Sequence, residues 1–297
     1  MRILFDDRRL LADEPMARHT TVKIGGSADY LADPQNEEEL AALLSEAREA
    51  GLPVTVIGKG SNLIVRDGGI RGLVVRVAKP FSGVMIEGNT VTALAGTPMA
   101  SLAASAAEAG LSGLEFISGI PGSVGGGVYM NAGAYGGEIK DTATRVRVMD
   151  RAGEIASYTR DQMCFTYRYS MLMQTNEVIT RVIFTLCPAE KRSIFLKMED
   201  LNTRRREKQP LNECSCGSVF KRPVGHYAGE LIERCGLSGY RIGQCEVSKK
   251  HAGFLVNTGT GTASDFLSLM DFIQQRVFDM TGVRLEPEIT VLGSDKG

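Results

Sequence analysis

Three short segments, far apart in the sequence, carry side chains that could take part in catalysis. The first, residues 165–170 (FTYRYS), puts Arg168 between two tyrosines at an apolar strand end. A guanidinium binds a carboxylate through two parallel hydrogen bonds, so Arg168 is suited to hold a planar anion. An arginine that only stacks on tyrosine rings is the competing interpretation.

The second segment offers a hydroxyl and the third offers two carboxylates. Ser218 follows a glycine on what is predicted to be a tight turn, but the G-x-S-x-G elbow of hydrolases is absent and no histidine is near. Glu286 and Glu288 flank Pro287 on a predicted strand and would point to one face of it. Taken alone, the serine is better explained as part of a turn, and the carboxylates as solvated charges.

A basic cluster leaves two interpretations open, and the histidines and cysteines predict no metal site. The basic cluster of Arg204, Arg205, Arg206 and Lys208 is either a solvated helix end that complements the helix dipole or a clamp for phosphate. The three histidines share no metal-ligand spacing, and the one C-x-C pair lacks partners, so no metal site is predicted.

Two glycine-rich segments indicate a nucleotide site. Residues 116–137 hold eight glycines and no charged side chain, which argues against a packed helix because each interior glycine costs about 1 kcal/mol relative to alanine. Main-chain N–H groups without side chains can approach a pyrophosphate, and Asn131 adds an amide. Residues 58–62 (GKGSN) form a second such turn after a predicted strand. A glycine-rich turn that only packs on its neighbours is the alternative.

Composition excludes several classes of protein. The chain has 297 residues and a net charge of −1 with both signs interspersed, so no basic surface for nucleic acid is expected. Charges interrupt residues 1–14, so no secretory signal is predicted there. No apolar run is long enough to span a membrane, so no membrane partner is expected. Six scattered cysteines are expected to be reduced thiols of a cytoplasmic protein.

The elements that must position these residues alternate irregularly between helix and strand. Asn36 caps a predicted helix that stops at Gly51, Pro98 is expected at the first helical position of another, and Thr262 caps a long amphipathic one. The other predicted helices are 193–208 and 228–235, and the predicted strands are 53–57, 63–65, 73–77, 84–86, 91–95, 145–150, 154–159, 178–186, one within 251–257, and 284–292. No Gly-x-Gly-x-x-Gly fingerprint follows a strand, so a Rossmann fold is disfavoured.

In order and spacing, these motifs resemble those of the bacterial UDP-N-acetylenolpyruvoylglucosamine reductases, flavoenzymes that complete UDP-N-acetylmuramate in peptidoglycan synthesis. The similarity runs nearly end to end, and residues 118–136 (SGIPGSVGGGVYMNAGAYG) are its most specific part. The other matching segments are 19–21 with 24–26, 58–63, 165–170, 217–221 and 285–289.

The resemblance implies an α+β fold with an FAD-binding region of the vanillyl-alcohol-oxidase (PCMH) type. That region would consist of two α+β subdomains, residues 1–78 completed by the strand 284–297, and residues 79–190. Residues 191–283 would form a C-terminal α+β substrate-binding domain of the shorter variety of the family. Residues 58–62 contain no histidine for covalent attachment, so FAD is expected to be non-covalent.

The resemblance also implies the residues of the site. Arg168 and Glu288 would stabilise charge on the substrate carboxylate while hydride passes from NADPH through the flavin to the enolpyruvyl group, and Ser218 would protonate the adjacent carbon. Substrate contacts would come from Tyr167, Lys208, Lys221 and Arg222. The implied FAD contacts are Ile57, Gly58, Lys59, Gly60, Ser61, Asn62, Leu63, Gly119, Pro121, Gly122, Ser123, Gly125, Gly126, Asn131, Gly133 and Ala134.

This chain departs from the family pattern at two positions. Arg222 and Gly253 stand where asparagine is usual, which affects substrate contacts and leaves the chemistry in place. Two other hypotheses are an oxidase of the same flavin fold, which usually carries an attachment histidine, and a UDP-sugar-binding protein without catalysis. Retention of Arg168, Ser218 and Glu288 together argues against the second. The oligomeric state is left open, and a monomer is compatible with the sequence.

Overall fold

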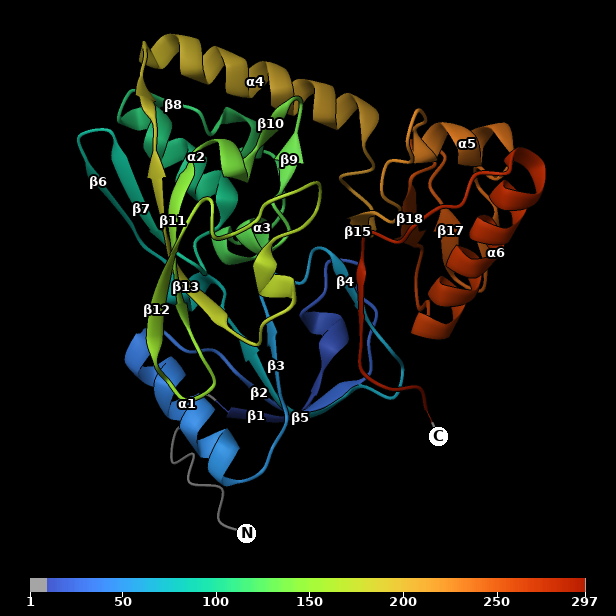
Figure 1. Ribbon diagram of the computed structural model, residues 1–297. Helices are drawn as coiled ribbons and strands as arrows, with labels where there is room; N and C mark the ends of the chain where they lie inside the picture. The colour runs from blue at the N-terminus through green and yellow to red at the C-terminus, as the bar shows by residue number, and fades with distance from the viewer. Residues whose placement is uncertain (1–9, 297) are drawn as a thin grey trace. The chain divides into compact units, whose positions relative to one another are not determined.

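The structure, a computed structural model, describes residues 10–296 and divides into two compact units (Figure 1). Of the described residues, the first unit comprises 10–11, 31–59 and 72–205. The second comprises residues 12–30, 60–71 and 206–296. Residues 1–9 of the predicted first subdomain, and residue 297, lie outside the described part.

An antiparallel sheet of order β12-β11-β13-β7-β6 dominates the first unit. Its strands are β6 (Val84–Glu87), β7 (Thr90–Leu94), β11 (Ala143–Met149), β12 (Ile155–Thr159) and β13 (Val178–Thr185). The unit also contains α1 (Glu37–Glu49), β3 (Val54–Ile57), α2 (Met99–Glu108), β8 (Leu111–Ser112), α3 (Val124–Tyr129), β9 (Gly133–Ala134), β10 (Gly137–Glu138) and β14 (Cys187–Pro188).

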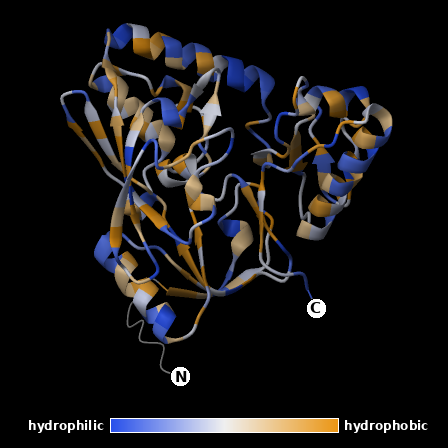
Figure 2. Cartoon of the chain, viewed as in Figure 1, coloured by the Kyte–Doolittle hydropathy of each residue, from blue (hydrophilic) through white to orange (hydrophobic). Residues whose placement is uncertain are grey.

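Four elements cross the boundary between the units: β1 (Leu10–Pro15), β2 (Ser27–Ala32), β5 (Ile70–Arg76) and α4 (Lys191–Lys208). A second sheet has the order β1-β2-β5-β3, in which β3 and β5 run parallel. Hydrophilic residues predominate along α4 (Figure 2), because its sequence is rich in Lys, Arg, Asp and Glu.

The second unit packs two helices on an antiparallel sheet of order β15-β18-β17-β16. The strands are β15 (Cys214–Ser218), β16 (Arg241–Ile242), β17 (Cys245–Val247) and β18 (Phe254–Asn257), and the helices are α5 (Ala228–Arg234) and α6 (Ala263–Thr281). A separate parallel pair joins β4 (Leu63–Val65) to β19 (Thr290–Leu292).

The predicted helix caps are confirmed where they depend on local side chains. Asn36 accepts a hydrogen bond of 2.8 Å from the Glu39 N–H at the start of α1. Thr262 and Asp265 form a reciprocal capping box on α6, whose predicted apolar face from Phe266 to Val277 is buried. Pro98 occupies the N-cap of α2 instead of the first helical position, and the last strand is shorter than predicted, since Pro287 forms only an isolated bridge with Phe220.

The helix α3 within residues 116–137 contradicts the expectation that so much glycine excludes a packed helix. Ser123 caps it by accepting from the Gly126 N–H. A β-carbon at Gly125 would lie 3.0 Å from Cβ of Ala95, and one at Gly127 would lie 2.7 Å from Sδ of Met99. The glycines allow α3 to pack closely against its neighbours in the first unit, and this packing outweighs their low helix propensity.

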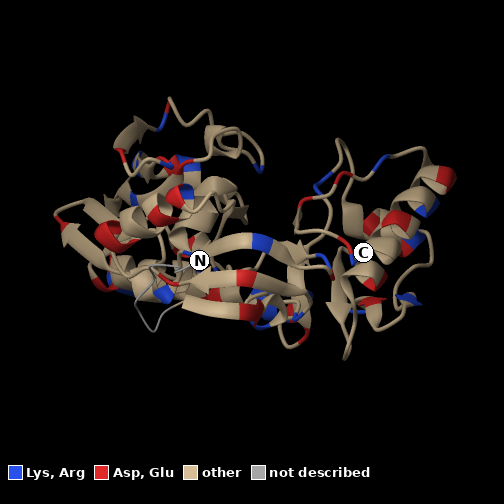
Figure 3. Ribbon diagram, turned by 90° about the horizontal axis from the view of Figure 1, so that it is seen from below, with Lys and Arg blue, Asp and Glu red and all other residues tan. Residues whose placement is uncertain are grey.

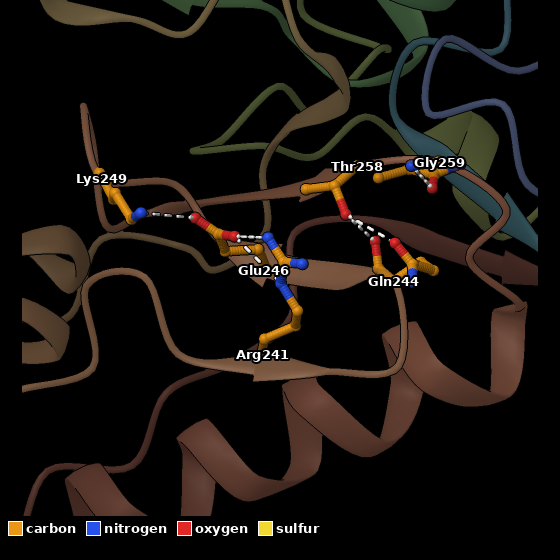
Figure 4. Close-up of polar contacts among 7 residues, drawn as sticks. Arg241, Gln244, Glu246, Lys249, Thr258 and Gly259 are labelled. Carbon is orange, nitrogen blue, oxygen red and sulfur yellow. Dashed lines mark hydrogen bonds and ion pairs between the residues drawn. The ribbon is translucent and has the colours of Figure 1, made fainter.

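Charged residues of both signs are interspersed within each unit (Figure 3). In the second unit polar contacts hold the hairpin of β16 and β17 (Figure 4). The buried Glu246 side chain lies between Arg241 and Lys249, and the Thr258 Oγ1 donates to the Gln244 carbonyl at 3.0 Å. Within residues 10–296, no helix combines the length and the apolar character needed to cross a bilayer.

Candidate active site

The turn after β3 presents a run of main-chain donors. The N–H groups of Gly58 through Asn62 donate no hydrogen bond within residues 10–296, whereas two of the carbonyls are engaged: Gly60 O accepts from Thr21 N, and Asn62 O from Thr290 N, each at 3.0 Å. Gly60 has φ +70°, and a β-carbon there would lie 2.0 Å from the His19 carbonyl oxygen, so only glycine fits. Successive unpaired N–H groups of this kind form an anion-binding concavity.

The two glycine-rich segments meet in the first unit. A β-carbon at Gly58 would lie 2.5 Å from the Ser123 Oγ. The N–H groups of Gly119, Gly122 and Ser123 also donate no hydrogen bond to any residue that the structure describes. Donors of the two segments thus lie close together at Gly58 and Ser123, and the cofactor contacts expected there stay a prediction.

The first turn of α3 offers no free N–H donor at Val124 or Gly125, but it leaves open space beside Gly126. Val124 N donates to Thr97 O and Gly125 N to Ala95 O, each at 2.8 Å, so both N–H groups are already paired. Gly126 is exposed, and a β-carbon there would have only the Ser123 Oγ within contact distance, at 3.5 Å. Unpaired donors beside open space fit the pyrophosphate of a dinucleotide cofactor such as FAD.

Asn131 is fully buried and has a left-handed main chain, with φ +44°. Its Nδ2 donates to Thr166 O at 2.9 Å and to Glu138 Oε2 at 3.1 Å, and its Oδ1 accepts from Lys140 N at 3.0 Å. Both N–H groups of the amide are thus engaged within the protein. The side-chain amide is therefore not available to a cofactor, and the predicted cofactor contact of Asn131 would have to come from its main chain.

Arg168 lies in a tight turn and not at a strand end as predicted. Thr166 and Tyr169 exchange two main-chain hydrogen bonds of 3.1 and 3.2 Å, which leaves Tyr167 and Arg168 at the tip. The Arg168 guanidinium donates to Gly133 O at 3.2 Å and lies 5.0 Å from the centre of the Tyr167 ring. The stacking that the competing interpretation predicted is therefore present.

Ser218 and Glu288 lie on paired segments of the second unit. Ser218 ends β15 directly after a bulge at Gly217, which has φ +81°, so the predicted simple turn is replaced by a strand end. Glu288 N donates to Val219 O at 2.7 Å. The Asn62 amide donates to Glu288 O at 3.2 Å, which ties this pair of segments to the turn of residues 58–62.

The two glutamates of the third segment have different surroundings. Glu286 is exposed and forms a 3.5 Å ion pair with Lys221, whereas Glu288 is half-buried. The guanidinium of Arg222 lies 4.0 Å from the centre of the Tyr227 ring, and Lys208 is exposed at the end of α4. No cluster of His, Cys, Asp and Glu suited to a metal ion occurs among residues 10–296.

The burial of Arg205 was not predicted from the sequence, in which it is one of four cations at the end of a helix. Arg205 is 7% exposed, and a β-carbon at Gly119 would lie 3.0 Å from its Cδ and Nε. Burial lowers the pKa of the Arg205 guanidinium, which also faces the Tyr135 ring. The signal was the spacing of the buried residues Ile194, Leu201 and Arg205, which share one face of α4.

Comparison with known proteins identifies the two regions of the chain. The family described as UDP-N-acetylenolpyruvoylglucosamine reductase, C-terminal domain, matches residues 209–292, and the family described as FAD binding domain matches residues 28–159. The UDP-N-acetylenolpyruvoylglucosamine reductase of Levilactobacillus brevis is 48% identical over 97% of this chain and 94% of its own length. That of Lactobacillus johnsonii is 50% identical over 95% of this chain and 94% of its own length.

A solved structure matches the fold. The crystal structure of UDP-N-acetylenolpyruvylglucosamine reductase from Thermus caldophilus has a TM-score of 0.82 and 35% sequence identity, and the match covers 96% of this chain and 98% of that one. The predicted α+β fold with an FAD-binding region is thereby confirmed. The chain belongs to the UDP-N-acetylenolpyruvoylglucosamine reductase family.

Proposed function

We infer that the protein is an NADPH-dependent flavoenzyme that reduces UDP-N-acetylglucosamine enolpyruvate to UDP-N-acetylmuramate for bacterial peptidoglycan. Membership of the reductase family supports this activity. The structural observation that carries it is the run of unpaired main-chain N–H groups from Gly58 to Asn62, with those around Ser123 beside Gly58. Such a run of donors binds anions, and the pyrophosphate of FAD is an anion of this kind.

The residues that would hold FAD without a covalent bond are those of the two glycine-rich segments. Gly58 to Asn62 would bind the pyrophosphate through main-chain N–H groups, and Gly119, Gly122 and Ser123 would add further donors. Bound FAD supplies the transfer of two electrons from NADPH to the substrate double bond. Arg205, buried beside Gly119, would add a fixed positive charge near this cradle.

The chain's own catalytic groups would act on the substrate carboxylate and the adjacent carbon. Arg168 would bind the carboxylate and stabilise the negative charge that develops as the double bond is reduced, and Glu288 would help in this only as a neutral carboxyl that donates a hydrogen bond. The Ser218 Oγ would give its proton to the carbon next to the carboxylate. The pairing of residue 219 with Glu288 supports a shared role for Ser218 and Glu288, since it keeps the two segments together.

Substrate contacts are proposed for Tyr167, Lys208, Lys221 and Arg222. The three cations suit a diphosphate, and Arg222 would supply a charge where relatives carry a neutral amide. Tyr167 is 44% exposed beside Arg168 and offers a ring and a hydroxyl to the sugar nucleotide.

The three-domain division, with residues 1–78 and 284–297, 79–190 and 191–283, remains our proposal. The parallel pairing of β19 with β4 supports the idea that the C-terminal strand completes the first subdomain. We also propose a cytoplasmic enzyme that binds neither nucleic acid nor membranes, which is supported by six free cysteines and a net charge of −1. A monomer is the simplest state for this proposal.

The proposed function can be tested on the purified protein. It should be yellow from bound FAD and should oxidise NADPH only when UDP-N-acetylglucosamine enolpyruvate is supplied. A colourless protein that does not take up FAD would contradict any flavoenzyme. NADPH oxidation at the same rate with and without the substrate would instead indicate an oxidase that uses oxygen.

A further inference from the structure

The turn that carries Arg168 adopts a main-chain conformation that needs external support. Arg168 has φ +55°, a left-handed value that a residue with a β-carbon adopts only at a cost in free energy. The two hydrogen bonds between Thr166 and Tyr169 close the turn but leave its orientation free. Whatever fixes the carbonyl of Thr166 therefore also fixes the direction of Arg168.

Three contacts attach this turn to one stretch of the glycine-rich segment. The Asn131 amide donates to Thr166 O at 2.9 Å, and the Arg168 guanidinium donates to Gly133 O at 3.2 Å. The fully buried Ser170 donates through Oγ to Tyr129 O at 2.8 Å. The turn of residues 166–170 thus contacts residues 129–133, which are the last residue of α3 and the four residues after it.

Asn131 is the member of this set whose side chain no similar residue can replace. Its two N–H groups face two acceptors, Thr166 O and Glu138 Oε2, while its oxygen faces the N–H of Lys140. An aspartate would place a carboxylate against both acceptors, and an apolar residue would remove one donor from each, which leaves Thr166 O bonded only to Tyr169 N and Glu138 Oε2 paired with Lys140. The left-handed main chain at φ +44° also suits asparagine better than most residues.

We propose that Asn131 is a positioning residue for catalysis, which acts through Arg168 by holding the Thr166 carbonyl. This inference rests on the proposed role of Arg168 at the substrate carboxylate. Asn131 would then matter when the substrate is reduced and not when NADPH reduces the bound flavin. A displacement of about 1 Å in such a group costs roughly 100-fold in rate.

Asn131→Gly is the sharpest variant, because glycine accepts the left-handed main chain and removes only the amide. In single-turnover experiments, reoxidation of the reduced flavin by the substrate should slow by roughly 30- to 100-fold, while reduction by NADPH and FAD affinity stay within about threefold. Asn89→Gly, the same change at an exposed position of the first unit, should leave all three unchanged.

A double-mutant cycle separates positioning from general damage. In an Arg168→Ala background, Asn131→Gly should cause no further slowing, because the group that it positions is absent. A second loss as large as the first would overturn the inference, as would a normal rate in Asn131→Gly when Arg168→Ala alone is slow. A normal rate in Arg168→Ala would instead refute the proposed role of Arg168 and the inference with it.

A readout without flavin or substrate tests the same contact. Trypsin cleaves after arginine only where the main chain can open locally. In the FAD-free protein, cleavage between Arg168 and Tyr169 should be at least about tenfold faster in Asn131→Gly, whereas cleavage after Arg284 stays unchanged. Equal cleavage rates at Arg168 in the variant and the unmodified chain would show that the amide does not hold the turn.

Discussion

At the scale of single residues, Ser218 is the group whose role is most specific. It stands at the end of β15, after the bulge at Gly217 and beside the segment of Glu288. A serine hydroxyl is a weak acid, so it transfers a proton efficiently only to a strongly basic carbon. It should therefore contribute to the substrate half of the reaction alone.

Ser218→Ala should slow reduction of the substrate by roughly 100- to 10,000-fold, the usual contribution of a general acid. Reduction of the flavin by NADPH should change by less than about threefold, since no proton from Ser218 is used there. The measurement is stopped-flow absorbance of the flavin in each half-reaction. The matched control is Ser215→Ala on the same strand, whose carbonyl, not its side chain, is bonded to Thr21. Equal losses in both half-reactions would remove Ser218 from the acid role.

At the scale of elements, α3 is defined by how closely it packs and by the space beside it. A β-carbon at Gly125 or Gly127 would be crowded by Ala95 or Met99, whereas Gly126 faces open space apart from Ser123. Two of the three glycines of α3 thus serve packing within the first unit. The third is required only if a ligand occupies the space beside it.

Gly126→Ala should therefore leave the FAD-free protein as stable as before, or more stable by up to about 1 kcal/mol from helix propensity. Its affinity for FAD should fall by roughly tenfold or more, because the added methyl group occupies the space of the cofactor. FAD titration followed by fluorescence and urea unfolding of the FAD-free protein measure the two effects. Gly83→Ala, which meets only Leu94 at 3.4 Å, is the control. Unchanged FAD affinity in Gly126→Ala would place the cofactor away from α3.

At the scale of the whole molecule, burial of the thiols makes stability depend on pH. Burial raises the pKa of Cys216 to about 12, from 9.0 for an ordinary thiol. The unfolded chain therefore loses this proton at lower pH than the folded protein does. The stabilisation is complete below pH 9 and is lost as pH rises toward about 12.

The free energy of unfolding should fall between pH 9 and 11, by at most about 1.4 kcal/mol per pH unit from this thiol. Cys216→Ala should reduce that slope, and Cys164→Ala, at an exposed cysteine, should not. Urea unfolding at three pH values measures the slope for each protein. Identical slopes for Cys216→Ala and the unmodified chain would show that Cys216 does not titrate differently on unfolding.

The sequence was sufficient for features that neighbouring residues decide. The caps of α1 and α6 were predicted because Asn36 and Thr262 bond to residues three positions along the chain. The two glycine-rich segments were singled out by their composition, whereas Arg168, Ser218 and Glu288 were assigned through the resemblance to the reductase family and stay predictions. Such signals survive without tertiary structure because they depend on local geometry and on chemistry that few residue types can perform.

Other features depended on contacts between residues that are distant in the sequence, and only the tertiary structure decided them. The helix α3 forms because its glycines pack against Ala95 and Met99, which outweighs a local preference that pointed the other way. The bulge before Ser218 arises from pairing with β18, and the Asn131 amide is taken by Thr166, thirty-five residues away. Propensity and spacing describe one segment at a time, whereas packing and buried hydrogen bonds are properties of pairs that only folding brings together.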